Sequence, residues 1–110
     1  MARALELKLQ KAGYQTDIAA NGREALDLLG HNRYDLLLLD IIMPKVNGFA
    51  VLEQLKKQGK GKPQIIVTTN LEQDDDRKRA LELGAIDYLV KSDTSIATIV
   101  EKINHALNQA

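Results

Sequence analysis

Apolar and polar positions along the chain follow two alternating periods, one typical of helices and one typical of strands. The helical period is clearest near the end of the chain, where apolar residues recur every three or four positions from Ile96 to Leu107. The segment from Tyr34 to Leu39 is instead an almost continuous apolar run, which is typical of a strand buried on both faces of a parallel sheet. The whole pattern predicts helices at 4–12, 23–29, 49–58, 72–83 and 96–107, and strands at 14–19, 34–39, 64–68 and 86–90.

Strands that alternate with helices indicate right-handed crossovers and a parallel sheet with helices on both faces. We therefore expect an α/β fold of four strands and five helices. The chain has 110 residues, the size of one domain, and residues 1–110 are expected to form a single unit. In open sheets of this kind, functional sites lie at the carboxyl ends of the strands.

Composition removes several classes of function. Fifteen basic side chains balance fifteen acidic ones, so no basic field is available to hold a nucleic-acid backbone. The chain has no cysteine, which excludes disulfides and thiolate metal sites, and the separate His31 and His105 are expected to have surface or helix-end roles. Apolar runs stay well short of the roughly 20 residues that span a bilayer. We expect a soluble, cytoplasmic protein that binds neither nucleic acid nor membrane.

Three polar residues stand at the carboxyl ends of successive predicted strands: Asp40, Thr69 and Lys91. Together they could accept a phosphoryl group, with the carboxylate as nucleophile and the hydroxyl and ammonium groups binding the charged oxygens. The plainer alternative is that any strand end carries a polar residue where it meets water. Strand alternation sends Thr68 to the opposite side from Thr69, so we assign Thr68 a structural role.

The sequence around these residues resembles the receiver domain of two-component response regulators. The matching stretches are Asp-Ile-Ile-Met-Pro-Lys-Val-Asn-Gly from Asp40, Ile-Ile-Val-Thr before Thr69, and Gly-Ala-Ile-Asp-Tyr-Leu-Val-Lys up to Lys91. The resemblance covers essentially the whole chain and implies a flavodoxin-like fold with strand order 2-1-3-4-5. It also implies that Asp40 is a phosphoacceptor served by a histidine kinase, that Thr69 closes on the phosphoryl oxygen, and that Lys91 is its salt-bridge partner.

The same resemblance implies a switch and a metal. Tyr88 corresponds to an aromatic residue whose rotamer follows phosphorylation, and the Ile42 carbonyl corresponds to a backbone ligand of Mg²⁺ beside Asp40. A phosphoryl group adds roughly −1.5 to −2 charge, which draws the hydroxyl and ammonium groups inward and alters the surface of the last strand and helix. On this reading the chain is a signalling module and not an enzyme.

Two departures from the family pattern stand out. The family's first strand, with the acidic pair that holds most of the magnesium, has no counterpart here, so only Asp40 and the Ile42 carbonyl remain of the ligand set. The acidic run 74–76 is expected in the first turn of a helix, where the helix dipole favours it, and not as a replacement ligand set. The family usually has Lys-Pro where this chain has Lys91-Ser92, and Ser92 is expected to be trans.

Without that first strand, the strand predicted at 34–39 becomes an edge, and an apolar edge is a template for further pairing. Either the segment 14–19 pairs with it directly, or two chains associate; we favour association into a homo-oligomer. Two functions follow as alternatives: a receiver that is switched by phosphorylation of Asp40, or a receiver-derived oligomerisation and interaction module that works without phosphorylation. A small-molecule enzyme is disfavoured because no glycine-rich phosphate loop follows any strand.

Overall fold

Helices and strands alternate along the chain, as the hydrophobic pattern predicts. The computed structural model describes residues 2–19, 21–41, 48–58, 63–70 and 74–108. The helices are α1 (Ala2–Lys11), α2 (Gly22–His31), α3 (Gly48–Gln58), α4 (Asp74–Glu82) and α5 (Ile96–Asn108). The strands are β1 (Leu36–Leu39), β2 (Gln64–Thr69) and β3 (Asp87–Val90), and a short 3-10 helix, η1 (Lys91–Asp93), follows β3. The α/β class and the five helices are confirmed.

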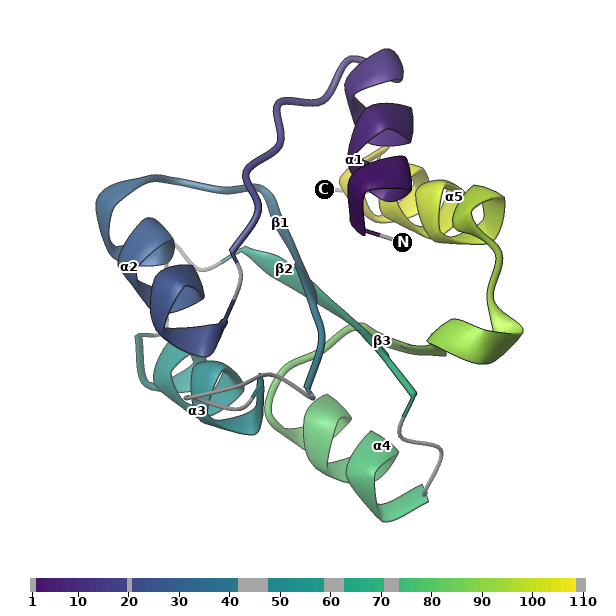
Figure 1. The fold of residues 1–110 in the computed structure, drawn as a ribbon. Helices are drawn as coiled ribbons and strands as arrows, with labels where there is room; N and C mark the ends of the chain where they lie inside the picture. Colours follow the sequence, from purple (N-terminus) through teal and green to yellow (C-terminus); the bar gives the residue numbers. More distant parts are fainter. Residues whose placement is uncertain (1, 20, 42–47, 59–62, 71–73, 109–110) are drawn as a thin grey trace.

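The strands form one parallel sheet in the order β1-β2-β3. Leu36 pairs with Gln64 and Leu39 with Val67, while Thr69 pairs with Val90 on the other side of β2. Because all described strands run in the same direction, their carboxyl ends lie at one edge of the sheet (Figure 1).

Helices cover both faces of this sheet (Figure 1). On one face, α2, α3 and α4 enclose a core in which Val51, Leu52 and Val67 are fully buried. On the other face, α1 and α5 enclose a second core around Ile66 and Ile99. The helical stripe predicted near the end of the chain is therefore the face that α5 buries against the sheet.

Local chemistry fixes where two of these helices begin. Asn21 caps α2, since its side-chain oxygen accepts a hydrogen bond from the Glu24 amide at 3.0 Å. Asp74, Asp75 and Asp76 occupy the first turn of α4, where the helix dipole favours acidic side chains. The predicted place of the acidic run, in the first turn of a helix, is confirmed.

The expected strand at 14–19 is wrong, and the sheet has three strands among the described residues instead of four. The segment has no regular secondary structure and is held by side chains: the Tyr14 hydroxyl donates to Asn104, and the Tyr34 hydroxyl donates to Asp17 at 2.6 Å. A strand needs a neighbouring backbone to pair with. Within the described ranges, residues 14–19 do not pair with β1, so the direct pairing considered for them does not occur.

As a result, β1 is an edge of the described sheet. It pairs with β2 on one side only, and Leu36, Leu37 and Leu38 are half-buried while Leu39 is buried. Half-burial is unusual for an all-leucine strand of a parallel sheet, which is normally covered on both faces and on both sides. In the described part of the chain, no helix is long and apolar enough to cross a membrane.

Candidate functional site

The carboxyl ends of β1 and β3 bring two predicted site residues into direct contact. Asp40 follows β1 and Lys91 follows β3, and Lys91 Nζ donates to Asp40 Oδ2 at 2.5 Å. The two side chains are 27% and 30% exposed, so the ion pair lies at the surface edge and remains accessible to a ligand. Asp40 and Lys91 are 51 positions apart in the sequence, and they meet because β2 pairs with both β1 and β3.

Thr69 and Tyr88 are both buried, one in β2 and the other in β3. Thr69 is fully buried at the last paired position of β2, and Tyr88 is 3% exposed in the middle of β3. Thr68 is also buried, so burial alone does not separate the two threonines. Thr69 is nevertheless the threonine at the strand end, next to the edge that carries Asp40 and Lys91.

An arginine of α4 holds Tyr88 from outside the sheet. The Arg77 guanidinium donates to the Tyr88 carbonyl at 3.1 Å and lies 5.8 Å from the centre of the tyrosine ring. Burial is the main cause that raises the pKa of Tyr88, and the negative charges of Asp76 and Asp40 raise it further, while Arg77 lowers it. Arg77, which no sequence motif marks, thus contacts both the carbonyl group and the ring of Tyr88.

Gly48 sets the backbone position of Asp40. Its amide donates to the Ile41 carbonyl at 3.0 Å, at the start of α3. A Cβ atom at this position would lie 2.5 Å from the Ile41 Cα and 2.9 Å from the Asp40 carbonyl oxygen. Because both neighbours are main-chain atoms, any larger residue here must displace the segment that carries the carboxylate.

The described residues do not assemble a magnesium site by themselves. Ile42, whose carbonyl was expected as a ligand, lies outside the described residues. Among the residues that are described, no group of three or more acidic, histidine or cysteine side chains could hold a metal ion. Asp40 provides one carboxylate, which is already paired with Lys91. Because magnesium prefers several oxygen ligands, this donor set does not fit the ion.

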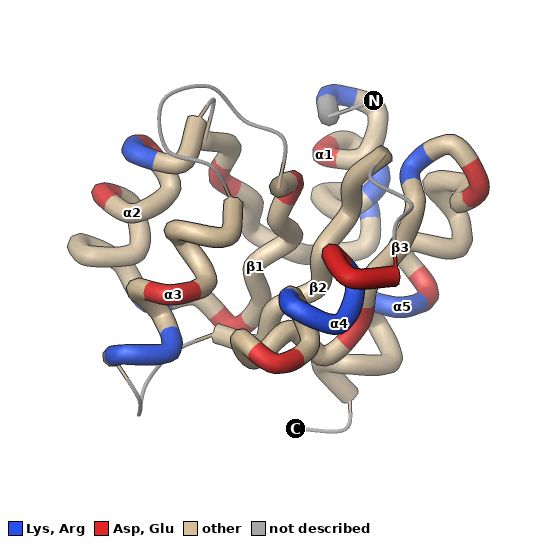
Figure 2. Tube along the Cα trace, turned by 90° about the horizontal axis from the view of Figure 1, so that it is seen from below, with Lys and Arg blue, Asp and Glu red and all other residues tan. Residues whose placement is uncertain are grey.

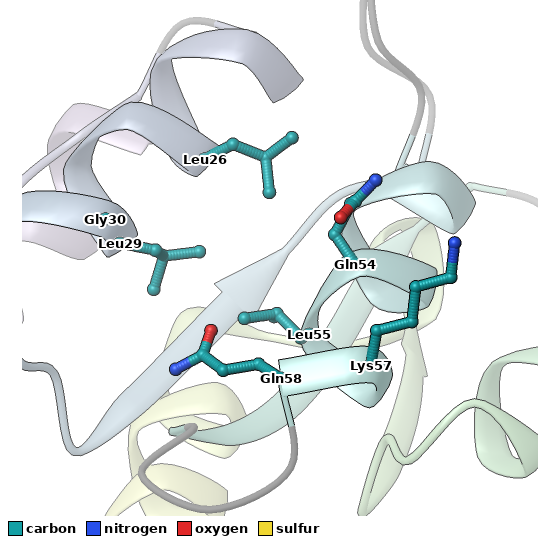
Figure 3. Close-up of a pocket in the computed structure, with 7 residues that line it drawn as sticks. All are labelled: Leu26, Leu29, Gly30, Gln54, Leu55, Lys57 and Gln58. Atoms are coloured by element: carbon teal, nitrogen blue, oxygen red, sulfur yellow. The ribbon is translucent and has the colours of Figure 1, made fainter.

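A separate pocket lies between α2 and α3, at the other end of α3 from Gly48 (Figure 3). Its volume is about 370 Å³, and apolar side chains of α2 and α3 form part of its lining. Leu26, Leu29 and Leu55 are its apolar lining residues, with Gln54 and Gln58 beside them. The pocket is therefore distinct from the strand-end site.

Charged side chains of both signs are spread over the helices (Figure 2). Acidic and basic residues occur together on α1, α2, α3, α4 and α5, which matches the formal net charge of zero. The strand-end site therefore does not lie in a large patch of one charge. Its charged feature is the single ion pair of Lys91 and Asp40.

Comparison with known proteins identifies the family. The model of the response regulator receiver domain matches residues 1–104. The chain is 36% identical over 109 residues to the uncharacterized transcriptional regulatory protein YkoG of Bacillus subtilis, a match that covers 99% of this chain and 47% of that protein. It is 43% identical over 83 residues to the transcriptional regulatory protein CusR of Escherichia coli, covering 76% of this chain and 36% of CusR. The chain thus spans less than half the length of these relatives.

Solved structures agree with this assignment. The Francisella response regulator 1452 receiver domain has a TM-score of 0.89 and 30% identity, and the match covers 98% of this chain and 88% of that one. The receiver domain of the sensor histidine kinase PA1611 from Pseudomonas aeruginosa, described with a magnesium ion in its active site cleft, has a TM-score of 0.83 and 26% identity over 97% of this chain and 88% of its own. The chain belongs to the response regulator receiver domain family and has its flavodoxin-like fold.

Proposed function

We propose that this receiver domain accepts a phosphoryl group on Asp40 from a histidine kinase and then alters a protein-interaction surface. The contact between Lys91 Nζ and Asp40 Oδ2 at 2.5 Å carries the proposal. It supports the proposal because a cation beside the Asp40 carboxylate would stabilise an arriving phosphoryl group, on the edge of the sheet where ligands bind in this class of fold.

The reaction is a transfer of the phosphoryl group between two nucleophiles. A carboxylate oxygen of Asp40 forms a new P–O bond while the bond from phosphorus to the donor's histidine nitrogen breaks, and the nitrogen keeps the electron pair. The Lys91 ammonium stabilises the charge on the phosphoryl oxygens during this exchange. Mg²⁺ is the cofactor expected of the family, but because the described residues do not form its site, no step is assigned to it.

The switch would follow from the charge that the phosphoryl group brings. It adds roughly −1.5 to −2 charge and new acceptor oxygens at Asp40. Lys91 can pair with these oxygens, and Thr69, the last residue of β2, is the hydroxyl that we expect to donate to them. Tyr88 is buried next to this site, on the strand that precedes α5. The surface of β3 and α5 is therefore where we expect a partner to sense phosphorylation.

Incubation with a phosphorylated histidine kinase and assay of acid-labile phosphate test this proposal. Wild type should take up one phosphoryl group per chain, and Asp40→Asn should take up none. Asp35→Asn is a matched control, because Asp35 is an exposed aspartate at the opposite end of β1. Uptake by Asp40→Asn equal to that of the wild type would refute the assignment of Asp40.

The unpaired edge of β1 favours a second function, association with another chain. Within the described residues its backbone pairs on one side only, and Leu36, Leu37 and Leu38 are half-buried. An apolar edge of this kind readily takes up a further strand. Light scattering over a concentration series should show a dimer or larger species, and Asp40→Asn should leave that mass unchanged. A monomer at every concentration would rule this function out.

A further inference from the structure

The chain leaves β3 through a short turn that carries Lys91 to Asp40. Lys91, Ser92 and Asp93 form the 3-10 helix η1. Thr94 closes the turn on its far side, since its hydroxyl donates to the Val90 carbonyl at 2.8 Å and its amide to the Lys91 carbonyl at 3.4 Å. These bonds define the shape of the turn but do not connect it to the rest of the sheet.

A hydrogen bond joins the turn to Asn70, the residue that follows β2. The backbone N–H of Ser92 donates to Asn70 Oδ1 at 3.2 Å. The strands β2 and β3 pair as far as Thr69 and Val90, so Asn70 and Ser92 stand just beyond the last pair. The Asn70 side chain acts there as an acceptor where the strand ladder has ended. It thereby links the residue after Thr69 to the residue after Lys91.

This bond requires that residue 92 is not proline. Proline at this position would have no N–H to donate. In this chain the residue is Ser92, and none of the peptide bonds in the described segments is cis. The N–H that serine provides is the one that Asn70 binds. The departure from the expected sequence pattern at Ser92 thus coincides with a hydrogen bond in the structure.

We infer that Asn70 is a positioning residue that holds the Ser92 amide and so keeps the Lys91 ammonium at Asp40. The inference rests on the proposed function and specifies how its lysine is placed. Asn70 acts through Lys91, which is the residue in contact with the carboxylate. Because transfer depends on reacting groups being held in place, a small displacement of Lys91 lowers the rate.

The test compares Asn70→Ala with the control Asn108→Ala, an exposed asparagine at the end of α5. Phosphorylation is measured with acetyl phosphate and Mg²⁺, alone and in a Lys91→Ala background. Asn70→Ala should lower the rate about 3- to 10-fold, the effect of one lost hydrogen bond, and Asn108→Ala should not. In the Lys91→Ala background, Asn70→Ala should have no further effect. An equal loss with and without Lys91 would overturn the inference.

A second readout separates this inference from the proposed function. Nuclear magnetic resonance reports the Ser92 amide, whose exchange with solvent should become faster in Asn70→Ala and stay slow in Asn70→Asp, which keeps an acceptor oxygen. Urea unfolding of Asn70→Ala, Lys91→Ala and the double variant should show that the two losses are not additive. If the wild type takes up no phosphate, the proposed function fails. Unchanged Ser92 exchange together with additive unfolding losses would then refute the role of Asn70.

Discussion

Two parts of strand β1 differ in what holds them. Its carboxyl end leads to Asp40, which is fixed by Gly48 on one side and by Lys91 on the other. Its lateral edge has no strand beside it in the described structure, and three of its four leucines are half-buried. The position of the strand end is set by the pairing of β1 with β2 and by the start of α3. The burial of the lateral edge would require a further strand or another chain beside it. The geometry at Asp40 and the completion of the sheet are therefore separate properties.

Leucine truncations compare core and edge directly, and they should have the largest effect on stability. Leu52→Ala removes a side chain that is 0% exposed and should cost about 2 to 5 kcal/mol of unfolding free energy. Leu37→Ala, on the half-buried edge, should cost only about 1 kcal/mol. Urea unfolding measures both. Equal losses would mean that the edge is as well packed as the core, which would contradict the comparison.

Substitution of the site lysine should affect chemistry more than stability. Lys91→Ala removes a charged hydrogen bond to Asp40 and should slow phosphorylation about 10- to 100-fold. Lys102→Ala is the control, because Lys102 forms a longer, exposed ion pair with Asp87 at 3.7 Å. Initial rates with acetyl phosphate give both values. If both variants slow the reaction equally, the contact at Asp40 has no special role.

A pair of glycine substitutions tests how tightly the strand end is built. Gly48→Ala forces a Cβ against the backbone of Asp40 and Ile41 and should cost about 1 to 3 kcal/mol, with a slower phosphorylation rate. Gly30→Ala places its Cβ where nothing lies within 4 Å, inside a helix, and should stabilise by about 0.5 to 1 kcal/mol. Thermal unfolding of the two variants should thus give opposite signs. A Gly48→Ala variant that is as stable as the wild type, or more stable, would refute the role of Gly48.

The smallest expected effect is on the titration of Tyr34, whose hydroxyl donates a hydrogen bond to Asp17. The hydrogen bond to Asp17 is the main cause that raises the pKa of Tyr34. Because the folded pKa lies above the unfolded one, this bond contributes at neutral pH and is lost as the pH rises through the folded pKa. Asp17→Asn should move the tyrosinate absorption of Tyr34 to lower pH, with Tyr34→Phe identifying the signal. An unmoved titration would show that the bond does not form in solution.

The fold was largely predictable from the sequence because hydrophobic periodicity depends on neighbours along the chain. The stripe of α5 and the acidic start of α4 are both local features. Whether residues 14–19 form a strand could not be predicted in this way, because a strand forms only where another backbone is available for pairing. Their pattern suits a strand, but no described strand pairs with them.

The candidate site was predictable as a set of residue types but not as a set of contacts. The order of Asp40, Thr69 and Lys91 at strand ends indicated the site, since parallel strands end together. The bonds from Arg77 to Tyr88 and from Ser92 to Asn70 join segments that are separate in the sequence. Only the serine in place of the family's proline was a signal for the second of them, because it supplies an N–H.

Native mass spectrometry of the wild type and Asp40→Asn after exposure to acetyl phosphate tests the central claim most directly. It reads the number of chains and the number of phosphoryl groups in the same particle. The account predicts one phosphoryl group per wild-type chain and none on Asp40→Asn, with the same number of chains in both particles. An unmodified wild type, or a variant that carries as much phosphate as the wild type, would contradict it.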